Sequence, residues 1–359
     1  MVLIKAYTSI NLGDDLFIKL ICEKHPNTKF CIIAKREYTT IFKDIKNLKI
    51  LWYTRDYINS KYKDNRVVAN EKMAKFVNKL SKKCDTYVYI GGSVFIEPKN
   101  GNIYRIKLFG EELSTFNKSY IIGSNFGPYY TDDYFKVAKD TIIPNLNHIT
   151  FRDLDSYSLF SDLPNTSLAP DVIFSMDTSK YINEKKKEIG ISLIHHLDRD
   201  VLAENYNKYL AEIAELIKKH IPLGYTICLL SFCKPERDLA AINDLLNILP
   251  ESYLPKIRVE EYVGDIEHFM NLFSQFEKVV GTRFHSIILG IKFNCEVIPI
   301  CYSNKTVNML HDLNFTDYCT FENLDIQNKK FSLILDKEQL EKITKNSEKH
   351  FLEFKKSTL

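Results

Sequence analysis

The chain has 359 residues, of which 45% are hydrophobic and 26% are charged, which is ordinary for a globular protein with enough apolar material for two cores. Its net charge of +3 is too small to indicate nucleic acid as a partner. No stretch approaches the roughly 20 apolar residues that a membrane span requires. Residues 1–6 lack the basic start and cleavage site of a signal peptide, so we expect a cytoplasmic protein.

The eight cysteines form no Cys-x-x-Cys pair, and most of them lie in apolar segments. They are expected to be buried thiols in a reducing compartment. No short-spaced Cys/His pair is matched by a second one, so the sequence predicts no metal site.

Short apolar segments alternate with longer amphipathic segments in the first half of the chain. The predicted strands are residues 2–7, 29–33, 49–52, 86–90 and 120–123. The predicted helices are residues 14–24, 67–82, 105–116 and 132–143. This alternation predicts a mostly parallel sheet with helices on both faces.

A second series of the same kind follows a polar, lysine-rich stretch at residues 175–188. Its predicted strands are residues 189–194, 225–230, 256–259, 278–280 and 297–300. Its predicted helices are residues 202–219, 237–249, 265–273, 283–291 and 305–310. We therefore expect one domain at residues 1–175 and a second at 188–332. A helix in residues 333–359 is expected to pack at the domain boundary or on the first domain.

The predicted fold class is α/β, with two domains that face each other across a cleft. In such open sheets, ligands bind beyond the carboxyl ends of the strands. Half of the twelve glycines lie at predicted strand ends, where glycine permits close approach of a ligand, although turns need glycine anyway. These glycines are Gly13, Gly91, Gly92, Gly123, Gly127 and Gly281.

The segment from Gly281 to Gly290 is the most informative one. A strand stops at Gly281, Thr282 is expected to cap the next helix, and Arg283 and His285 lie in its first turn. Cations are unfavourable at a helix N-terminus unless an anion lies among them, and such termini bind phosphate or carboxylate. The alternative is a surface arginine and a core histidine that merely begin a helix.

Polar residues also follow the first predicted strand, in Asn11-Leu12-Gly13-Asp14-Asp15. Asn11 and Asp14 are expected to present polar groups to the cleft, where Asp14 could accept a proton from a hydroxyl. The alternative is that either residue caps the next helix, since acidic and amide side chains suit a helix start.

Three further strand ends carry candidate groups. Gly91-Gly92-Ser93 follows residues 86–90, and its backbone amides could form an anion-binding concavity. Ser124 and Asn125 follow residues 120–123 and are expected to face the cleft.

Arg152 closes a short apolar run, so its guanidinium is expected at a strand tip, where it suits bidentate binding of phosphate or carboxylate. The alternative is an ion pair with Asp153 or Asp155. Pro170 and Asp171 are expected to start the last strand of the first domain, and Asp171 to orient Arg152 or cap a turn.

His195 and His196 directly follow residues 189–194. Adjacent residues of an extended chain point in opposite directions, which argues against a metal site made by this pair. His195 is expected to contact a substrate, and the other histidine to be structural.

In this order, the segments resemble the polysaccharide pyruvyl transferase family. The matching elements are Asn11-x-Gly13-Asp14, Gly91-Gly92-Ser93, the segment 123–128, Arg152-Asp153-x-x-Ser156, Pro170-Asp171 and Arg283-x-His285. The segment 123–128 departs from the glycine-richer form associated with the family, so its contacts are expected to differ here.

The resemblance implies two Rossmann-like domains of the GT-B type, with phosphoenolpyruvate as the donor. The implied acceptor is a pair of sugar hydroxyls on a glycan or on a nucleotide- or lipid-linked precursor, and the product is a pyruvyl ketal. By the same matching, Arg152, Arg283 and His285 correspond to donor-binding and catalytic positions.

The residues suit this chemistry. Arg152 and Arg283 could bind the phosphate and carboxylate of phosphoenolpyruvate, His285 could protonate its CH₂ carbon, and Asp14 is the candidate base for the sugar hydroxyl. The scheme requires no metal or other cofactor. The further substrate-binding candidates are Asn11, Gly91, Gly92, Ser93, Asn125, His195 and Ser286.

Two other functions are compatible with the same architecture. One is a glycosyltransferase that uses a nucleotide sugar, with Glu260, Glu261 or Asp265 as a ribose anchor. The other is a non-catalytic binding protein. Near the C-terminus, Phe351 and Phe354 alternate with lysines, which fits either peripheral membrane contact or a solvated helix with one buried stripe.

Overall fold

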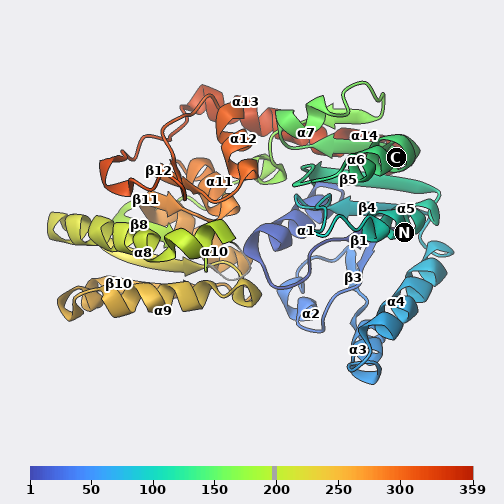
Figure 1. Cartoon of the computed structure of the whole chain (residues 1–359), viewed down its shortest axis with the longest axis horizontal. Helices are drawn as coiled ribbons and strands as arrows, with labels where there is room; N and C mark the ends of the chain where they lie inside the picture. The colour runs from blue at the N-terminus through green and yellow to red at the C-terminus, as the bar shows by residue number, and fades with distance from the viewer. Residues whose placement is uncertain (196–199, 359) are drawn as a thin grey trace. The chain divides into compact units, whose positions relative to one another are not determined.

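The computed structural model describes residues 1–195 and 200–358, and the chain divides into two compact units (Figure 1). Unit 1 consists of Met1–Thr8, Leu16–Ser175 and Lys345–Leu359, and unit 2 of Ser9–Asp15 and Met176–Thr344. Each unit is therefore assembled from segments that are far apart in the sequence.

Unit 1 contains a parallel sheet of seven strands in the order β3-β2-β1-β4-β5-β6-β7. The strands are β1 (Val2–Lys5), β2 (Phe30–Ile32), β3 (Leu48–Ile50), β4 (Thr86–Ile90), β5 (Lys118–Ser124), β6 (His148–Phe151) and β7 (Thr166–Leu168). Their central members are almost entirely buried because helices cover both faces.

One face of this sheet packs on helices that follow β3 and β4. Leu3, Tyr87 and Ile121 of the sheet share a buried cluster with Val77 and Leu113 of these helices. The helices of this unit are α1 (Leu12–Lys24), which begins in unit 2, α2 (Tyr38–Ile41), α3 (Trp52–Lys61), α4 (Arg66–Ser81), α5 (Tyr104–Ser114), α6 (Asp132–Lys136), α7 (Leu154–Ser158) and α14 (Leu352–Thr358).

The C-terminal helix α14 lies against the opposite face. The ring of Phe354 lies 5.4 Å from that of Tyr120 on β5 and 4.8 Å from that of His25 at the end of α1. Phe351 and Phe354 are buried, which agrees with the predicted alternative of a helix with one buried stripe. No helix among the described residues is long and apolar enough to cross a membrane.

Unit 2 contains a parallel sheet of six strands in the order β10-β9-β8-β11-β12-β13. The strands are β8 (Lys186–Ser192), β9 (Thr226–Ser231), β10 (Ile257–Glu261), β11 (Phe276–Gly281), β12 (Glu296–Cys301) and β13 (Cys319–Thr320). The helices are α8 (Asp200–His220), α9 (Asp238–Ile248), α10 (Ile266–Gln275), α11 (Phe284–Lys292), α12 (Asn304–Asp312) and α13 (Lys337–Ser347), whose last residues belong to unit 1.

Helices again cover both faces of the sheet. Tyr209 and Ile213 of α8 share a buried cluster with Ile191 and Leu229 of the sheet. Phe273 of α10 lies outside this cluster and packs against Phe276 of β11, with 5.5 Å between the ring centroids. The α/β fold class with two Rossmann-like sheets is thus confirmed.

The chain leaves unit 1 after β1 and contributes Ser9–Asp15 to unit 2. Asn11 forms an antiparallel bridge with Cys233, and the amide of Leu12 donates to the carbonyl of Phe232 at 3.3 Å. Ile10 has φ +51°, a left-handed conformation that a β-branched residue rarely adopts. Such strain persists only where surrounding contacts hold it, as the bridge at Asn11 does here.

Some local predictions were wrong. Pro170 and Asp171 do not start a strand but follow β7, because the carboxylate of Asp171 accepts the amide of Ile173 at 3.0 Å and so turns the chain into a short 3-10 helix at Val172–Ser175. The predicted single C-terminal helix is interrupted by a 3-10 turn at Glu348–Phe351.

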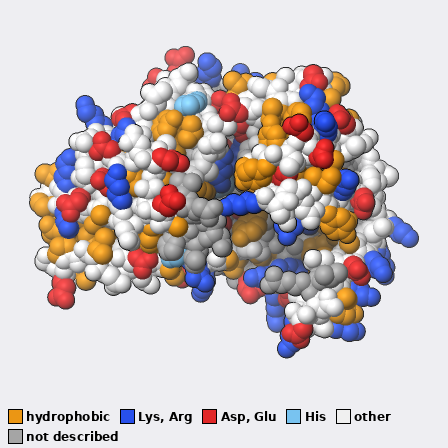
Figure 2. Space-filling model, in the orientation of Figure 1, with side chains coloured by type: hydrophobic (Ala, Val, Ile, Leu, Met, Phe, Trp, Pro, Cys, Tyr) orange, Lys and Arg blue, Asp and Glu red, His pale blue; other side chains and the backbone are white. Residues whose placement is uncertain are grey.

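Two general expectations agree with the structure. Each of the eight cysteines is buried and free. Acidic and basic side chains are interspersed over the face drawn in Figure 2, as the small net charge indicates.

Candidate functional site

In unit 1, several predicted site residues meet at the carboxyl edge of the sheet. Gly91, Gly92 and Ser93 follow β4, Asn125 follows β5 and Arg152 follows β6. Because β4, β5 and β6 are parallel neighbours, their carboxyl ends share one edge. Gly92 and Arg152 are buried, whereas Ser93 is exposed.

The guanidinium of Arg152 lies directly against the backbone of Gly92. A Cβ atom at Gly92 would come within 2.3 Å of its Cζ, Nη1 and Nη2 atoms. Nη1 donates to Asp171 at 2.9 Å and Nη2 to the side-chain oxygen of Asn125 at 2.8 Å. Arg152 is only 5% exposed, so these partners satisfy a buried cation and fix its orientation. The expectation that Asp171 orients Arg152 is confirmed.

The C-terminal segment of unit 1, from Lys345 onward, supports the Arg152–Asp171 contact through hydrogen bonds to the backbone. Ser347 donates its hydroxyl to the carbonyl of Asp171 at 2.8 Å, and Nε2 of His350 lies 2.7 Å from the carbonyl of Pro170. Burial lowers the pKa of His350 to about 3, the bond to Pro170 opposes this shift, and the charge of Arg152 adds to it. His350 is therefore neutral and donates from Nε2.

Asp153 and Ser156 of the Arg-Asp-x-x-Ser element have structural roles. The carboxylate of Asp153 accepts the amide of Ser156 at 2.8 Å and so caps α7. The hydroxyl of Ser156 accepts the amide of Phe126 at 2.8 Å, which ties α7 to the segment 123–128. The predicted alternative of an Arg152–Asp153 ion pair is not what the structure contains, because Arg152 bonds to Asp171 instead.

In unit 2, the helix α11 that follows β11 has a different N-cap residue from the predicted one. The N-cap of α11 is Arg283, whose carbonyl accepts the amide of Ser286 at 2.9 Å, and Thr282 lies one residue earlier. The hydroxyl of Thr282 instead lies 2.9 Å from that of Tyr209. The expectation that Thr282 caps this helix was therefore wrong.

Ser192, at the end of β8, fixes the same turn. Its hydroxyl oxygen accepts the amides of Thr282 at 3.0 Å and Arg283 at 3.1 Å. With both acceptor sites used, it donates its proton to the Ser286 hydroxyl 2.6 Å away, which in turn donates to the carbonyl of Arg283. Ser286 is buried and helps to fix this turn, and its contact with a substrate stays a prediction.

The side chain of Arg283 is held by two carboxylates that the sequence analysis did not single out. Its Nε donates to Asp238 at 3.1 Å, Nη2 also donates to Asp238, and Nη1 donates to Glu236. Burial alone would lower the pKa of Arg283, but Asp238 and Glu236 outweigh it and the pKa lies above its ordinary value. The available signal was a Glu-x-Asp pair at the start of α9, in the connection that follows β9.

His285 lies against the start of α1. A Cβ atom at Gly13 would come within 1.7 Å of Nδ1 of His285. The side-chain oxygen of Asn11 accepts the amide of Gly13 at 3.1 Å, so Asn11 caps α1, as one of the alternatives had it. Asp14 lies in the first turn of α1 and is half-buried. Two predicted elements from opposite ends of the chain thus form one cluster in unit 2.

The next residue anchors this cluster. Asp15 is completely buried, and its carboxylate accepts the hydroxyl of Tyr262 at 2.8 Å. Because Tyr262 follows β10, the start of α1 is fixed to the sheet edge of unit 2 by a buried side-chain bond as well as by the bridge at Asn11.

The remaining candidates lie apart from these clusters. Nε2 of His195 is 3.9 Å from Asp244, and its ring lies 5.4 Å from that of Tyr206. His196 lies outside the described residues.

The possible ribose anchors differ in their surroundings. Glu260 bonds to Arg258 and His268, and Asp265 caps α10. Oε1 of Glu261 is buried without a hydrogen-bond partner among the described residues.

Solved structures share this architecture. The chain is similar to Anabaena HepE in complex with UDP and glucose, with a TM-score of 0.55, 10% identity, and coverage of 98% of this chain and 95% of that one. It is also similar to UDP-GlcNAc 2-epimerase from Neisseria meningitidis, with a TM-score of 0.56, 12% identity, and coverage of 99% and 98%. The fold is therefore GT-B-like.

The family follows from the sequence. The profile of the polysaccharide pyruvyl transferase family matches residues 11–304, which is most of the chain. This chain therefore belongs to the polysaccharide pyruvyl transferase family, a family of transferases. It is 21% identical over 274 residues to the amylovoran biosynthesis protein AmsJ of Erwinia amylovora. That alignment covers 69% of this chain and spans 63% of the length of AmsJ.

Proposed function

We propose that this protein transfers the enolpyruvyl-derived group of phosphoenolpyruvate to two hydroxyls of a sugar, on a cell-surface glycan or its precursor. Family membership supports the reaction class, and the relative AmsJ is named for the synthesis of an exopolysaccharide. The observation that carries the proposal is the cluster in unit 2, where Gly13, between the cap residue Asn11 and the acidic Asp14, lies against the ring of His285.

In the proposed reaction, His285 donates a proton to the CH₂ carbon of phosphoenolpyruvate, which becomes a methyl group. The adjacent carbon becomes electron-poor, and one sugar hydroxyl attacks it after giving its proton to Asp14. The C–O bond to phosphate breaks, inorganic phosphate leaves, and the second hydroxyl closes the ketal. The second hydroxyl proton leaves with phosphate, so atoms and charges balance without a redox partner.

The two arginines have different proposed roles. Arg152 is buried against Gly92 and presents a fixed guanidinium at the sheet edge of unit 1, which suits the phosphate or carboxylate of the donor. Arg283 is already paired with Asp238 and Glu236. His285 lies two positions after Arg283. We therefore propose that Arg283 mainly holds His285 in position and contributes to donor binding only indirectly.

The test is an incubation of the full chain with phosphoenolpyruvate and candidate acceptors, read by phosphate release and by the mass of the acceptor. Transfer requires both readouts, whereas phosphate release alone indicates hydrolysis. His285→Gln should lower kcat by about 10²–10⁴-fold, and Arg152→Gln should raise KM for phosphoenolpyruvate. The exposed His311→Gln is the matched control.

A parallel incubation with UDP- and GDP-sugars tests the glycosyltransferase alternative, since the structurally similar HepE and epimerase are in complex with UDP and with UDP-GlcNAc. The buried, unpartnered Oε1 of Glu261 is the feature that favours this alternative. Turnover of a nucleotide sugar without use of phosphoenolpyruvate would replace the proposed function.

A further inference from the structure

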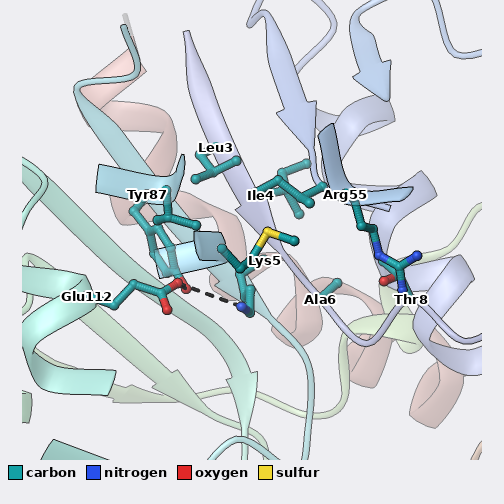
Figure 3. Close-up of a pocket in the computed structure, with 11 residues that line it drawn as sticks. Leu3, Ile4, Lys5, Ala6, Thr8, Arg55, Tyr87 and Glu112 are labelled. Carbon is teal, nitrogen blue, oxygen red and sulfur yellow. Dashed lines mark hydrogen bonds and ion pairs between the residues drawn. The ribbon is translucent and has the colours of Figure 1, made fainter. Parts of the chain in front are cut away.

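Unit 1 contains a cavity of about 170 Å³ whose lining includes neither Gly92 nor Arg152 (Figure 3). It lies at the carboxyl end of β1, and side chains of α3, α4 and α5 complete its wall. An engineered cavity of about 150 Å³ holds benzene. The volume therefore suits one six-membered ring and is too small for a disaccharide or a nucleotide.

Charged and hydroxyl groups line one part of the cavity. Nζ of Lys5 lies 3.8 Å from Glu112, which also accepts the hydroxyl of Tyr87 at 2.7 Å. Figure 3 shows this group on one side and Arg55, with Thr8 near it, on the other. A carboxylate accepts hydrogen bonds from sugar hydroxyls, whereas lysine and arginine donate to oxygen atoms and bind anions.

The two cations are available to a ligand. The side chain of Lys5 is 47% exposed and that of Arg55 is 21% exposed. The partner of Arg55 is its sequence neighbour Asp56 at 3.4 Å, which is 40% exposed. Exposed ion pairs of this kind contribute little to stability, so a phosphate could replace Asp56 at small cost.

The rest of the wall is apolar. Leu3, Ile33 and Val77 contribute aliphatic surface, and Met73 contributes a flexible thioether. A sugar ring presents C–H groups on its faces and hydroxyls around its rim. An aliphatic surface beside a carboxylate and two cations therefore matches a sugar ring that carries an anionic substituent.

The part of the cavity near Lys5 approaches the sheet edge that carries the Arg152 cluster. Lys5 at the end of β1 pairs in register with Tyr89 on β4, two residues before Gly91. The cavity extends along one face of the sheet from Leu3 and Tyr87, the second residues of β1 and β4, to Ala6 and Thr8 beyond the carboxyl end of β1. This last part adjoins the edge at which open α/β sheets bind ligands.

We propose that this cavity binds the acceptor as a single sugar residue with a phosphate attached. Glu112 and Lys5, on one side of the cavity, bond to the sugar hydroxyls, and Arg55, with Thr8 near it on the other side, binds the phosphate. The assignment of the ligand as the acceptor depends on the proposed function, whereas the binding of a sugar phosphate does not.

Binding is measured by calorimetry on the full chain, with the 1-phosphates of glucose, galactose and mannose, the three free hexoses, and inorganic phosphate. At least one hexose 1-phosphate should bind more tightly than its hexose and than phosphate. Arg55→Gln should weaken that binding by about 10- to 100-fold, as expected for a lost charge-assisted bond. Lys61→Gln removes a charge from the same helix outside the cavity and should change the affinity less than about twofold.

Ala6→Leu provides a steric test, because it adds volume to the cavity wall without changing its charge. It should abolish binding while circular dichroism stays unchanged. The inference is overturned if no hexose 1-phosphate binds more tightly than phosphate, or if both Arg55→Gln and Ala6→Leu leave the affinity unaltered.

Failure of the proposed function gives a different result. If a sugar phosphate binds as expected but no pyruvyl transfer occurs, the site stands and the function does not. If transfer occurs and Arg55→Gln leaves KM for the acceptor unchanged, the function stands and this site is not the acceptor site.

Discussion

Gly92 has only a hydrogen atom where other residues carry a Cβ atom, and the Arg152 guanidinium lies so close that a Cβ atom does not fit there. Flexible arginine ends usually move away from an added methyl group at little cost. Here the guanidinium bonds to Asp171 and Asn125 and is buried, so it cannot move without breaking those bonds. In unit 2, a Cβ atom at Gly13 would likewise come within 1.7 Å of Nδ1 of His285.

Gly92→Ala should therefore displace Arg152 and destabilise unit 1 by about 1–3 kcal/mol, the usual range for overpacking a closed site. The measurement is denaturant unfolding followed by fluorescence of Trp52, the one tryptophan of the chain, which lies in unit 1. Binding of phosphoenolpyruvate should weaken as much as it does in Arg152→Gln.

A double-mutant cycle separates this cause from a general backbone effect. In an Arg152→Ala background the added methyl group meets no guanidinium, so Gly92→Ala should cost much less there. Equal costs in both backgrounds would contradict the assigned contact.

At the scale of elements, the segment that includes α14 supports the Arg152 cluster. Ser347 and His350 bond to the backbone of residues 170–171, and Asp171 in turn bonds to Arg152. His350 performs this task only while it is neutral, because a protonated imidazole would lie buried near the Arg152 charge.

This neutrality makes unit 1 sensitive to acid. The pKa of His350 is lowered by burial from 6.5 to about 3, so the unfolded chain binds a proton at a higher pH than the folded one does. Stability is therefore lost as the pH falls below about 6.5 towards 3, with about 2 kcal/mol lost between pH 7 and pH 5. Burial also lowers the pKa of His25, to about 4, so this residue contributes to the loss of stability in acid in the same direction.

The measurement is unfolding of the wild type and of His350→Gln at both pH values, with Trp52 as the reporter. Glutamine keeps a donor for the Pro170 carbonyl but does not titrate, so the variant should lose about 2 kcal/mol less than the wild type does. The same loss in both proteins would exclude His350 as the cause. His311→Gln, at an exposed position of unit 2, is the control.

Elements with strong apolar patterns could be predicted from the sequence. The strand predicted at residues 86–90 coincides with β4, because five consecutive residues there are buried or half-buried. In contrast, β7 and β13 were missed because they are only three and two residues long and have no usable periodicity. The helix α3 was missed because its hydrophobic residues are few and mixed with polar ones.

Part of the candidate site could be predicted because some of its residues also stand in recognisable local patterns. Arg152, His285 and the glycines stand out because they follow strands. Glu236 and Asp238 give only the weak signal of a Glu-x-Asp pair, and their role becomes clear when folding brings them to Arg283. The hydrogen bonds of Ser286 depend on Ser192, which is 94 positions away in the sequence, and no local pattern predicts that contact.

At the scale of the whole molecule, the two units are interleaved in sequence. Residues 9–15 belong to unit 2, and the residues from Lys345 onward belong to unit 1. A cut between Ser175 and Met176 therefore does not give two complete units, although it falls at the predicted domain boundary.

We expect fragments 1–175 and 176–359, produced together, to copurify as a complex in size-exclusion chromatography. Each fragment carries a segment that completes the other, including Phe354, whose ring packs against Tyr120. Shortening the second fragment to 176–344 removes one of these segments and should weaken the association at least tenfold, as expected when buried aromatic side chains are lost. Separate elution of the full-length pair would contradict the assignment of the units.

The placement of Phe354 on the unit 1 sheet also has a consequence for synthesis on the ribosome. At roughly 5–20 residues per second, the ribosome needs on the order of ten seconds or more to make the second half after the first has emerged. During that interval the surface around Phe30 and Tyr120 stays uncovered, because its last helix has not been translated. The nascent chain must therefore avoid aggregation through this exposed apolar face until α14 has left the ribosomal exit tunnel.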